Sequence, residues 1–238
     1  MIRFFFFSIA IGLGFGTACQ SNVFQSPSEI NQEQNADQEI SKLILEKRYK
    51  EVEDRLRKRL QEVIDRFTKD RLRETLARVL LMELGVNQNK IKDVLDSGSK
   101  LQKLDTLVQE SPEPNATNIQ KMNEVSTLLE TSQQTDAAHF AASETIAMMQ
   151  IGSRLKKTRG PDGKFNKELA MEKLTDEDAA AIVTNMKALE NNYMAAGKTQ
   201  DAERMHKNIE TLQALPGSSE RIQVIEFFEK VQKEELEL

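Results

Sequence analysis

The chain has 238 residues, of which 39% are hydrophobic and 30% charged, and its formal net charge is −5 at pH 7. A single cysteine excludes an internal disulfide framework and any cysteine-based zinc site, because both need at least two thiols. The isoelectric point near 5.4 and the mean hydropathy of −0.53 argue against nucleic acid as a partner and against a polytopic membrane protein. The small numbers of glycines and prolines disfavour folds with many tight turns.

Residues 1–18 have the layout of a secretory signal peptide. Arg3 supplies the positive charge, residues 4–15 are almost entirely apolar, and small residues at positions 16–18 lead to Cys19. The stretch between Arg3 and Cys19 is shorter than the about 20 residues that a membrane-spanning helix needs. We therefore expect a cleaved signal peptide rather than an uncleaved anchor.

The residues before Cys19 resemble the lipobox of bacterial lipoproteins. Thr17 and Ala18 match its small residues, whereas Gly16 stands where leucine is usual. The resemblance implies that Cys19 receives fatty acyl chains such as palmitate and attaches the mature protein to a membrane. Gln20, in place of an aspartate, favours the outer membrane with the protein facing the periplasm. The alternative is an ordinary secreted protein that is cleaved near Ala18.

Residues 19–36 are rich in Gln, Asn and Ser. A segment of this composition has few apolar side chains to bury, and it is typical of a flexible tether. From Asp37 onward the apolar residues recur with a period of 3.6, which predicts helical hairpins over 37–110. Gly85 follows one such stripe and suits the left-handed residue that ends a helix. The charges on the opposite face around 55–59 indicate a solvated surface rather than a basic docking stripe.

Residues 111–117 contain two prolines, at positions 112 and 114, which exclude a helix interior. We predict a hinge or domain boundary there, followed by a C-terminal helical region over 118–238. Within that region, the Ala- and Met-rich stretch 137–151 is apolar around most of its circumference, which is typical of a central bundle helix. Met148 and Met149 then either fill the core or line an adaptable apolar groove.

Leu189, Tyr193, Gly197 and Ala202 follow one another at a spacing that resembles a tetratricopeptide repeat. The resemblance places one helix pair near 176–214, and residues 43–56 echo half of the same pattern without its glycine. It implies stacked antiparallel helix pairs that present a surface to a segment of a partner protein. The predicted fold is therefore all-α, either a tetratricopeptide-like α-solenoid or an irregular helical bundle, without significant β-sheet.

The two histidines of the chain each follow an acid by three residues, in the pairs Asp136/His139 and Glu203/His206. Two such pairs on helices are typical of di-iron and di-manganese bundles, for which Glu144 and Glu190 would supply further carboxylates. The competing interpretation is that these are surface or capping histidines, since acids are abundant. We adopt the second interpretation and expect no metal, no cofactor and no catalytic site.

The sequence predicts a non-enzymatic, lipid-anchored helical scaffold or adaptor of the bacterial cell envelope. Its partners would be the membrane, through the lipid on Cys19, and a protein that the sequence does not identify. The alternative function is a periplasmic small-molecule-binding lipoprotein that accompanies a transporter, with its pocket beside the helix at 137–151. Catalysis has no support, because the chain lacks a recognisable Ser–His–Asp order or a phosphate-binding loop.

Overall fold

The structure is a computed structural model that describes residues 27–86, 100–233 and 236. The predicted signal peptide, Cys19 and the first part of the predicted tether lie outside these residues. The described residues form ten helices and no sheet, with one isolated β-bridge between Arg159 and Phe165. The prediction of an all-α fold is confirmed.

The chain divides into two compact units, residues 1–42 and 43–238. The helices in chain order are α1 Pro27–Leu45, α2 Tyr49–Glu62, α3 Arg66–Glu83, α5 Lys100–Glu110, α6 Ala116–Thr131, α7 Ala137–Lys156, α8 Lys167–Lys173, α9 Asp176–Ala195, α10 Thr199–Ala214 and α11 Glu220–Gln232. None of the described helices combines the length and the apolar composition that crossing a membrane requires.

Helix α1 begins at Pro27, ten residues before the helical pattern predicted from Asp37 onward. Proline is well tolerated at the first helical position, because its missing N–H has no partner there in any helix. The residues that follow are mostly Gln, Glu, Asn and Ala, which carry no apolar stripe to reveal a helix. The helix therefore extends into the segment whose composition is typical of a tether.

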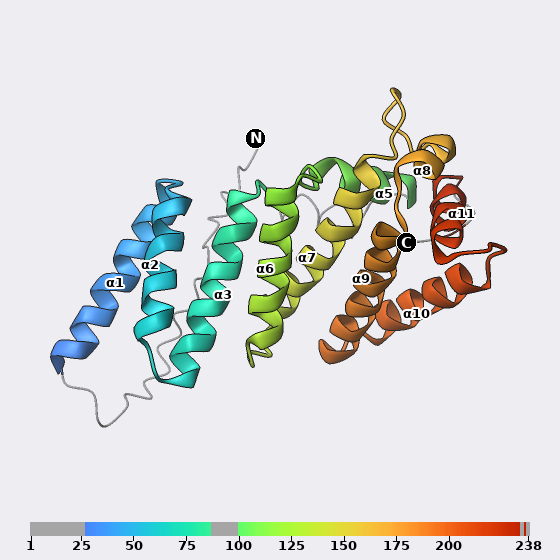
Figure 1. Ribbon diagram of the computed structural model, residues 1–238. Helices are drawn as coiled ribbons and strands as arrows, with labels where there is room; N and C mark the ends of the chain where they lie inside the picture. The colour runs from blue at the N-terminus through green and yellow to red at the C-terminus, as the bar shows by residue number, and fades with distance from the viewer. Residues whose placement is uncertain (1–26, 87–99, 234–235, 237–238) are drawn as a thin grey trace, which may run out of the picture. The chain divides into compact units, whose positions relative to one another are not determined.

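In the unit formed by residues 43–238, helices α2, α3, α6, α7 and α9 succeed one another side by side (Figure 1). Each packs on the next, and the short connections at 63–65 and 132–136 make α2/α3 and α6/α7 antiparallel pairs. The order then becomes less regular: α5 packs on α7 and α11, and α11 also contacts α8, α9 and α10.

Helix α7 lies among four other helices of this unit, because it contacts α3, α5, α6 and α9. Its buried residues run almost without a break from Ala142 to Leu155, and they include Met148 and Met149 at 6% and 0% exposure. The predicted central position of this helix is confirmed. The two methionines fill the core rather than lining an open apolar groove.

Gly152 allows α7 to approach the end of α5 closely. A β-carbon built at this position would lie 2.1 Å from Oγ of Ser111 and 2.7 Å from the carbonyl oxygen of Leu107. Ser111 itself donates a hydrogen bond of 2.6 Å to Leu107, so it has little freedom to move away. The segment after α5 is also held from α7, because Lys156 donates to the Ser111 carbonyl at 2.7 Å.

Three helix ends share one backbone geometry. Gly85 and Gly197 have φ values of +75° and +72°, and Lys47 takes the same role with a φ of +57°. In each case the left-handed residue bonds to the carbonyl three residues back and its successor bonds to the carbonyl five residues back. Five residues after Lys47 and Gly197, Val52 and Ala202 are buried at 0% and 2% exposure. The predicted role of Gly85 as a helix end is confirmed.

Helix α9 begins with a capping box formed by Thr175 and Asp178. Thr175 accepts from the Asp178 amide, and the Asp178 carboxylate accepts from the Thr175 amide at 2.9 Å. Asp178 also pairs with Lys157 at the end of α7. Burial raises the pKa of the Asp178 carboxyl, but the hydrogen bonds from Lys157 and Thr175 outweigh it, so the net pKa is lower than usual.

We predict that Gly152→Ala destabilises the protein by about 1–3 kcal/mol, although alanine favours a helix interior by about 1 kcal/mol over glycine. The reason is that the new methyl group meets backbone and a bonded serine. The matched control is Ser153→Ala, because the buried Ser153 hydroxyl has no partner in the described structure and its loss is expected to be neutral or stabilising. Urea denaturation measures both. Equal stability of the Gly152→Ala and Ser153→Ala proteins would contradict the close approach of α7 to the end of α5.

Asp178→Asn is expected to lower the melting temperature at pH 7 by about 2–4 °C, equivalent to about 1 kcal/mol. Because the folded-state pKa of Asp178 lies below its unfolded value, its contribution is complete above a pH of about 4 and is lost as the pH falls below that value. The difference from the parent protein therefore shrinks toward pH 2. Asp176→Asn, in the first turn of the same helix, is the control. A difference in melting temperature between Asp178→Asn and the parent protein that stays constant with pH would contradict the stabilising role of the ionised Asp178 carboxylate.

Candidate functional site

A groove runs along one side of α7, with α6 and α9 as its walls. Its volume is about 590 Å³, and its floor is formed by a single stripe of α7. Six side chains, spaced from one end of the stripe to the other, make up this floor: His139, Ser143, Ile146, Ala147, Gln150 and Arg154. At a rise of 1.5 Å per residue, the stripe is about 22 Å long. The predicted pocket beside the helix at 137–151 is therefore present as an elongated groove.

The walls of the groove are rich in carboxamides. Asn123 comes from α6, and Asn185, Asn191 and Asn192 come from α9. Asparagine is among the poorer residues for a helix interior, at a cost of roughly 0.7 kcal/mol relative to alanine. Four of them facing one groove are therefore not explained by helix stability. Each carboxamide offers both donors and acceptors to a ligand.

These carboxamides differ in how many of their donors and acceptors already have a hydrogen-bond partner. Gln150 donates to Oδ1 of Asn123 and to Oγ of Ser126, both at 3.2 Å. Asn185 donates to the Ala181 carbonyl of its own helix at 2.8 Å, which leaves its oxygen as an acceptor. Within the described residues, the side chains of Asn191 and Asn192 make no hydrogen bond. The groove thus has unused bonding capacity mainly on the α9 wall.

Arg154 provides the positive charge at one end of the groove. Its Nη1 donates to the Gln150 carbonyl at 2.9 Å, and it makes no ion pair among the described residues. Burial lowers the pKa of this guanidinium, and the through-space effect of Asp178 offsets this only partly. Asp178 is itself bonded to Lys157 and Thr175. Arg154 is thus a partly desolvated cation that has no carboxylate partner in the part of the chain that the structure describes.

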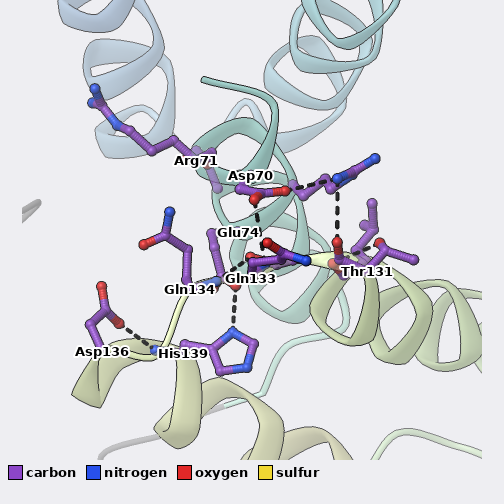
Figure 2. Close-up of polar contacts among 12 residues, drawn as sticks. Asp70, Arg71, Glu74, Thr131, Gln133, Gln134, Asp136 and His139 are labelled. Atoms are coloured by element: carbon purple, nitrogen blue, oxygen red, sulfur yellow. Dashed lines mark hydrogen bonds and ion pairs between the residues drawn. The ribbon is translucent and has the colours of Figure 1, made fainter. Parts of the chain in front are cut away.

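The other end of the groove contains His139, which is paired with a buried glutamate of α3 (Figure 2). Nδ1 of His139 lies 2.6 Å from Oε1 of Glu74, and the two side chains are only 12% and 7% exposed. Glu74 engages only the Nδ1 atom of this ring, and Nε2 takes no part in the pair. The second carboxylate oxygen of Glu74 is buried without a partner in the described structure.

A second buried acid of α3 holds the loop between α6 and α7 (Figure 2). Asp70 pairs with Arg73 at 2.8 Å and accepts from the Gln133 amide at 3.4 Å, while Arg73 donates to the Thr131 carbonyl at 3.3 Å. Asp136 then caps α7 by accepting from the His139 amide at 2.8 Å. These contacts fix the start of α7, and with it the position of His139.

The carboxylate–histidine pattern does not assemble into a metal site in the described residues. No group of three or more His, Cys, Asp or Glu side chains there is placed to hold an ion. Asp136 acts as a helix cap, and His139 and His206 have different carboxylate partners. His206 lies 2.8 Å from Glu190, whose hydrogen bond raises the pKa of the imidazole. His206 is a surface histidine, whereas the side chain of His139 is only 12% exposed and pairs with the buried Glu74.

Glu144, the other candidate carboxylate, joins α7 to the end of α9. It accepts from the Tyr193 hydroxyl at 3.1 Å and from Lys198 at 2.8 Å, and the Lys198 ammonium lies 5.3 Å from the centre of the Tyr193 ring. Burial, followed by the charge of Glu144, raises the pKa of the Tyr193 phenol. Tyr193 is thus a structural contact between the walls and floor of the groove.

The sequence interpretation did not identify Glu74, Arg154 or the asparagines. One signal was available: Asn185 and Asn192 are seven residues apart, so they share a face of one helix. The sequence around Glu74 contains no such signal, because an acidic residue within a helix of alternating charge is normally solvated. Comparison of the chain with protein-family models, curated proteins and solved structures finds no match.

We predict that His139→Phe destabilises the protein by about 3 kcal/mol, because it leaves the Glu74 carboxylate buried without a partner. Glu74→Leu removes that charge, so the double variant is expected to be more stable than the sum of the two single losses by at least 1 kcal/mol. Urea denaturation of the four proteins measures the coupling. Strictly additive losses would contradict a direct interaction of the two side chains.

Proposed function

We propose that this protein is a non-enzymatic, lipid-anchored adaptor of the bacterial cell envelope, which binds a segment of a partner protein in the groove along α7. The groove carries the proposal. It is elongated, its walls belong to α6 and α9 on either side of α7, and carboxamides line it where helix stability gives no reason for them. Stacked helices commonly present such surfaces to protein segments.

The anchoring part of the proposal rests on residues 3–19. A positive n-region, an apolar stretch and small residues before Cys19 support cleavage and acylation at that cysteine. Two or more acyl chains give stable attachment, whereas one gives only marginal binding. Gln20 supports the outer membrane, with the helical part facing the periplasm.

A periplasmic small-molecule binder is the second candidate, and one observation favours it. The groove volume of about 590 Å³ lies within the 300–1,000 Å³ that is usual for small-ligand sites. Such sites normally enclose most of the ligand and are mainly apolar. A stripe about 22 Å long with many carboxamides matches a chain segment better than a compact molecule.

The adaptor proposal is tested with a photo-crosslinking amino acid placed at Ala188, which lines the groove on α9. The control position is the neighbouring Lys187, which is exposed and outside the groove lining. In the source organism's own envelope, we expect a discrete protein adduct from position 188 and none from position 187. Absence of any protein adduct from position 188 would contradict the adaptor function.

The same strain, with Cys19 replaced by serine, tests the anchor. Acylation needs the thiol, so Cys19→Ser is expected to move the protein from the membrane fraction to the soluble fraction, and the adduct yield at position 188 is expected to fall. Mass spectrometry of the parent N-terminus should find acylated Cys19. A Cys19→Ser protein that remains in the membrane fraction would overturn the lipid attachment. The binding of a partner segment in the groove would then be tested by the crosslinking experiment at position 188 alone.

A further inference from the structure

We infer that the groove selects an extended, acidic segment of the partner protein, whose Asp or Glu side chain pairs with Arg154. This inference rests on the proposed function and adds the chemical class of the ligand and its orientation. It depends on three features of the described residues: an unpaired cation, the bonding capacity of the groove walls, and the different charges at the two ends of the groove.

The unpaired cation is Arg154. A guanidinium presents five donors in a planar fork that matches a carboxylate, and only one of its nitrogens is engaged, by the Gln150 carbonyl. Asp178, the carboxylate whose charge acts on Arg154, already has Lys157 and the start of α9 as partners. A carboxylate entering the groove would therefore find a partly desolvated arginine without having to displace an existing ion pair.

The carboxylate belongs to a side chain rather than to a chain terminus. Terminal carboxylates are usually captured by successive backbone N–H groups in a nest. The groove is lined by residues of α6, α7 and α9, and those beside Arg154 lie inside helices, where the backbone N–H groups are already used. Side chains are thus the available donors, and they suit a segment that passes through the groove.

An extended segment fits the remaining lining. A stripe about 22 Å long accommodates about six or seven residues at 3.3 Å each. Along that length, Asn191 and Asn192 have free carboxamides and Asn185 has a free acceptor, which match the alternating N–H and C=O groups of a peptide backbone. A compact ligand would leave most of these groups unused.

The end of the groove opposite Arg154 is unfavourable for a second acidic side chain of the bound segment. It is lined by Glu130 and by His139, whose Nδ1 is engaged by the buried Glu74 carboxylate. A carboxylate placed there would meet the like charge of Glu130, whereas an N–H donor would meet an acceptor. The bound segment is therefore oriented with its acidic residue at the Arg154 end of α7.

The test uses the mature protein in detergent micelles and a random mixture of seven-residue peptides with both termini blocked. Peptides retained by the immobilised protein are sequenced by mass spectrometry. We expect Asp and Glu to be enriched at one position near an end of the peptide. In Arg154→Gln this enrichment is lost and affinity for a selected acidic peptide falls about tenfold, the usual worth of a charged hydrogen-bonded pair. Lys187→Gln, which removes one positive charge outside the groove, retains both.

The alternatives give different results. Retention of peptides without acidic enrichment, or enrichment that survives in Arg154→Gln, overturns this inference and leaves the adaptor function standing. Retention only of peptides with free C-termini overturns the side-chain assignment. Binding of glutarate without retention of any peptide overturns the inference together with the adaptor function and favours the small-molecule binder. Circular dichroism melting confirms that each variant is folded, so a loss of binding is attributable to the groove.

Discussion

The burial of α7 on several sides is the constraint on which the rest of this unit depends. A helix in contact with α3, α5, α6 and α9 has most of its surface covered, and the stripe of α7 that lines the groove lies between α6 and α9. Gly152 sets how closely α5 approaches from another side. Because packed interiors tolerate little change in volume, the small and flexible side chains of α7 fix the spacing of its neighbours and hence the width of the groove.

Polar contacts hold both ends of α7, in addition to those that Glu144 and Gln150 make along its length. At the beginning, Asp136 caps the helix and Glu74 receives His139; at the end, Lys157 reaches Asp178 across to α9. Hydrogen bonds of this kind contribute modestly to stability, but leaving a buried charge unpaired is costly. They therefore position α7 along its axis, whereas the apolar contacts hold it in place laterally.

Local signals made the helices and their ends predictable. Gly197 and the Thr175–Asp178 box depend on a few neighbouring residues, and the all-round apolar character of 137–151 anticipated its burial. The groove was expected only as a pocket beside that helix. The placement of Glu74 beside His139 joins residues 65 positions apart, and no spacing within a single helix encodes such a contact. Tertiary packing decided it.

The turn at Lys47 has a mechanical consequence. It repeats the backbone geometry of Gly85 and Gly197 with a residue that carries a β-carbon, at a cost of about 1 kcal/mol. Of these three helix ends, it is the one whose left-handed residue is not glycine. Under the proposed attachment at Cys19, tension from the membrane reaches α1 before any later helix. The chain would then yield at this turn, lengthening the link to the membrane while the helices that form the groove keep their packing.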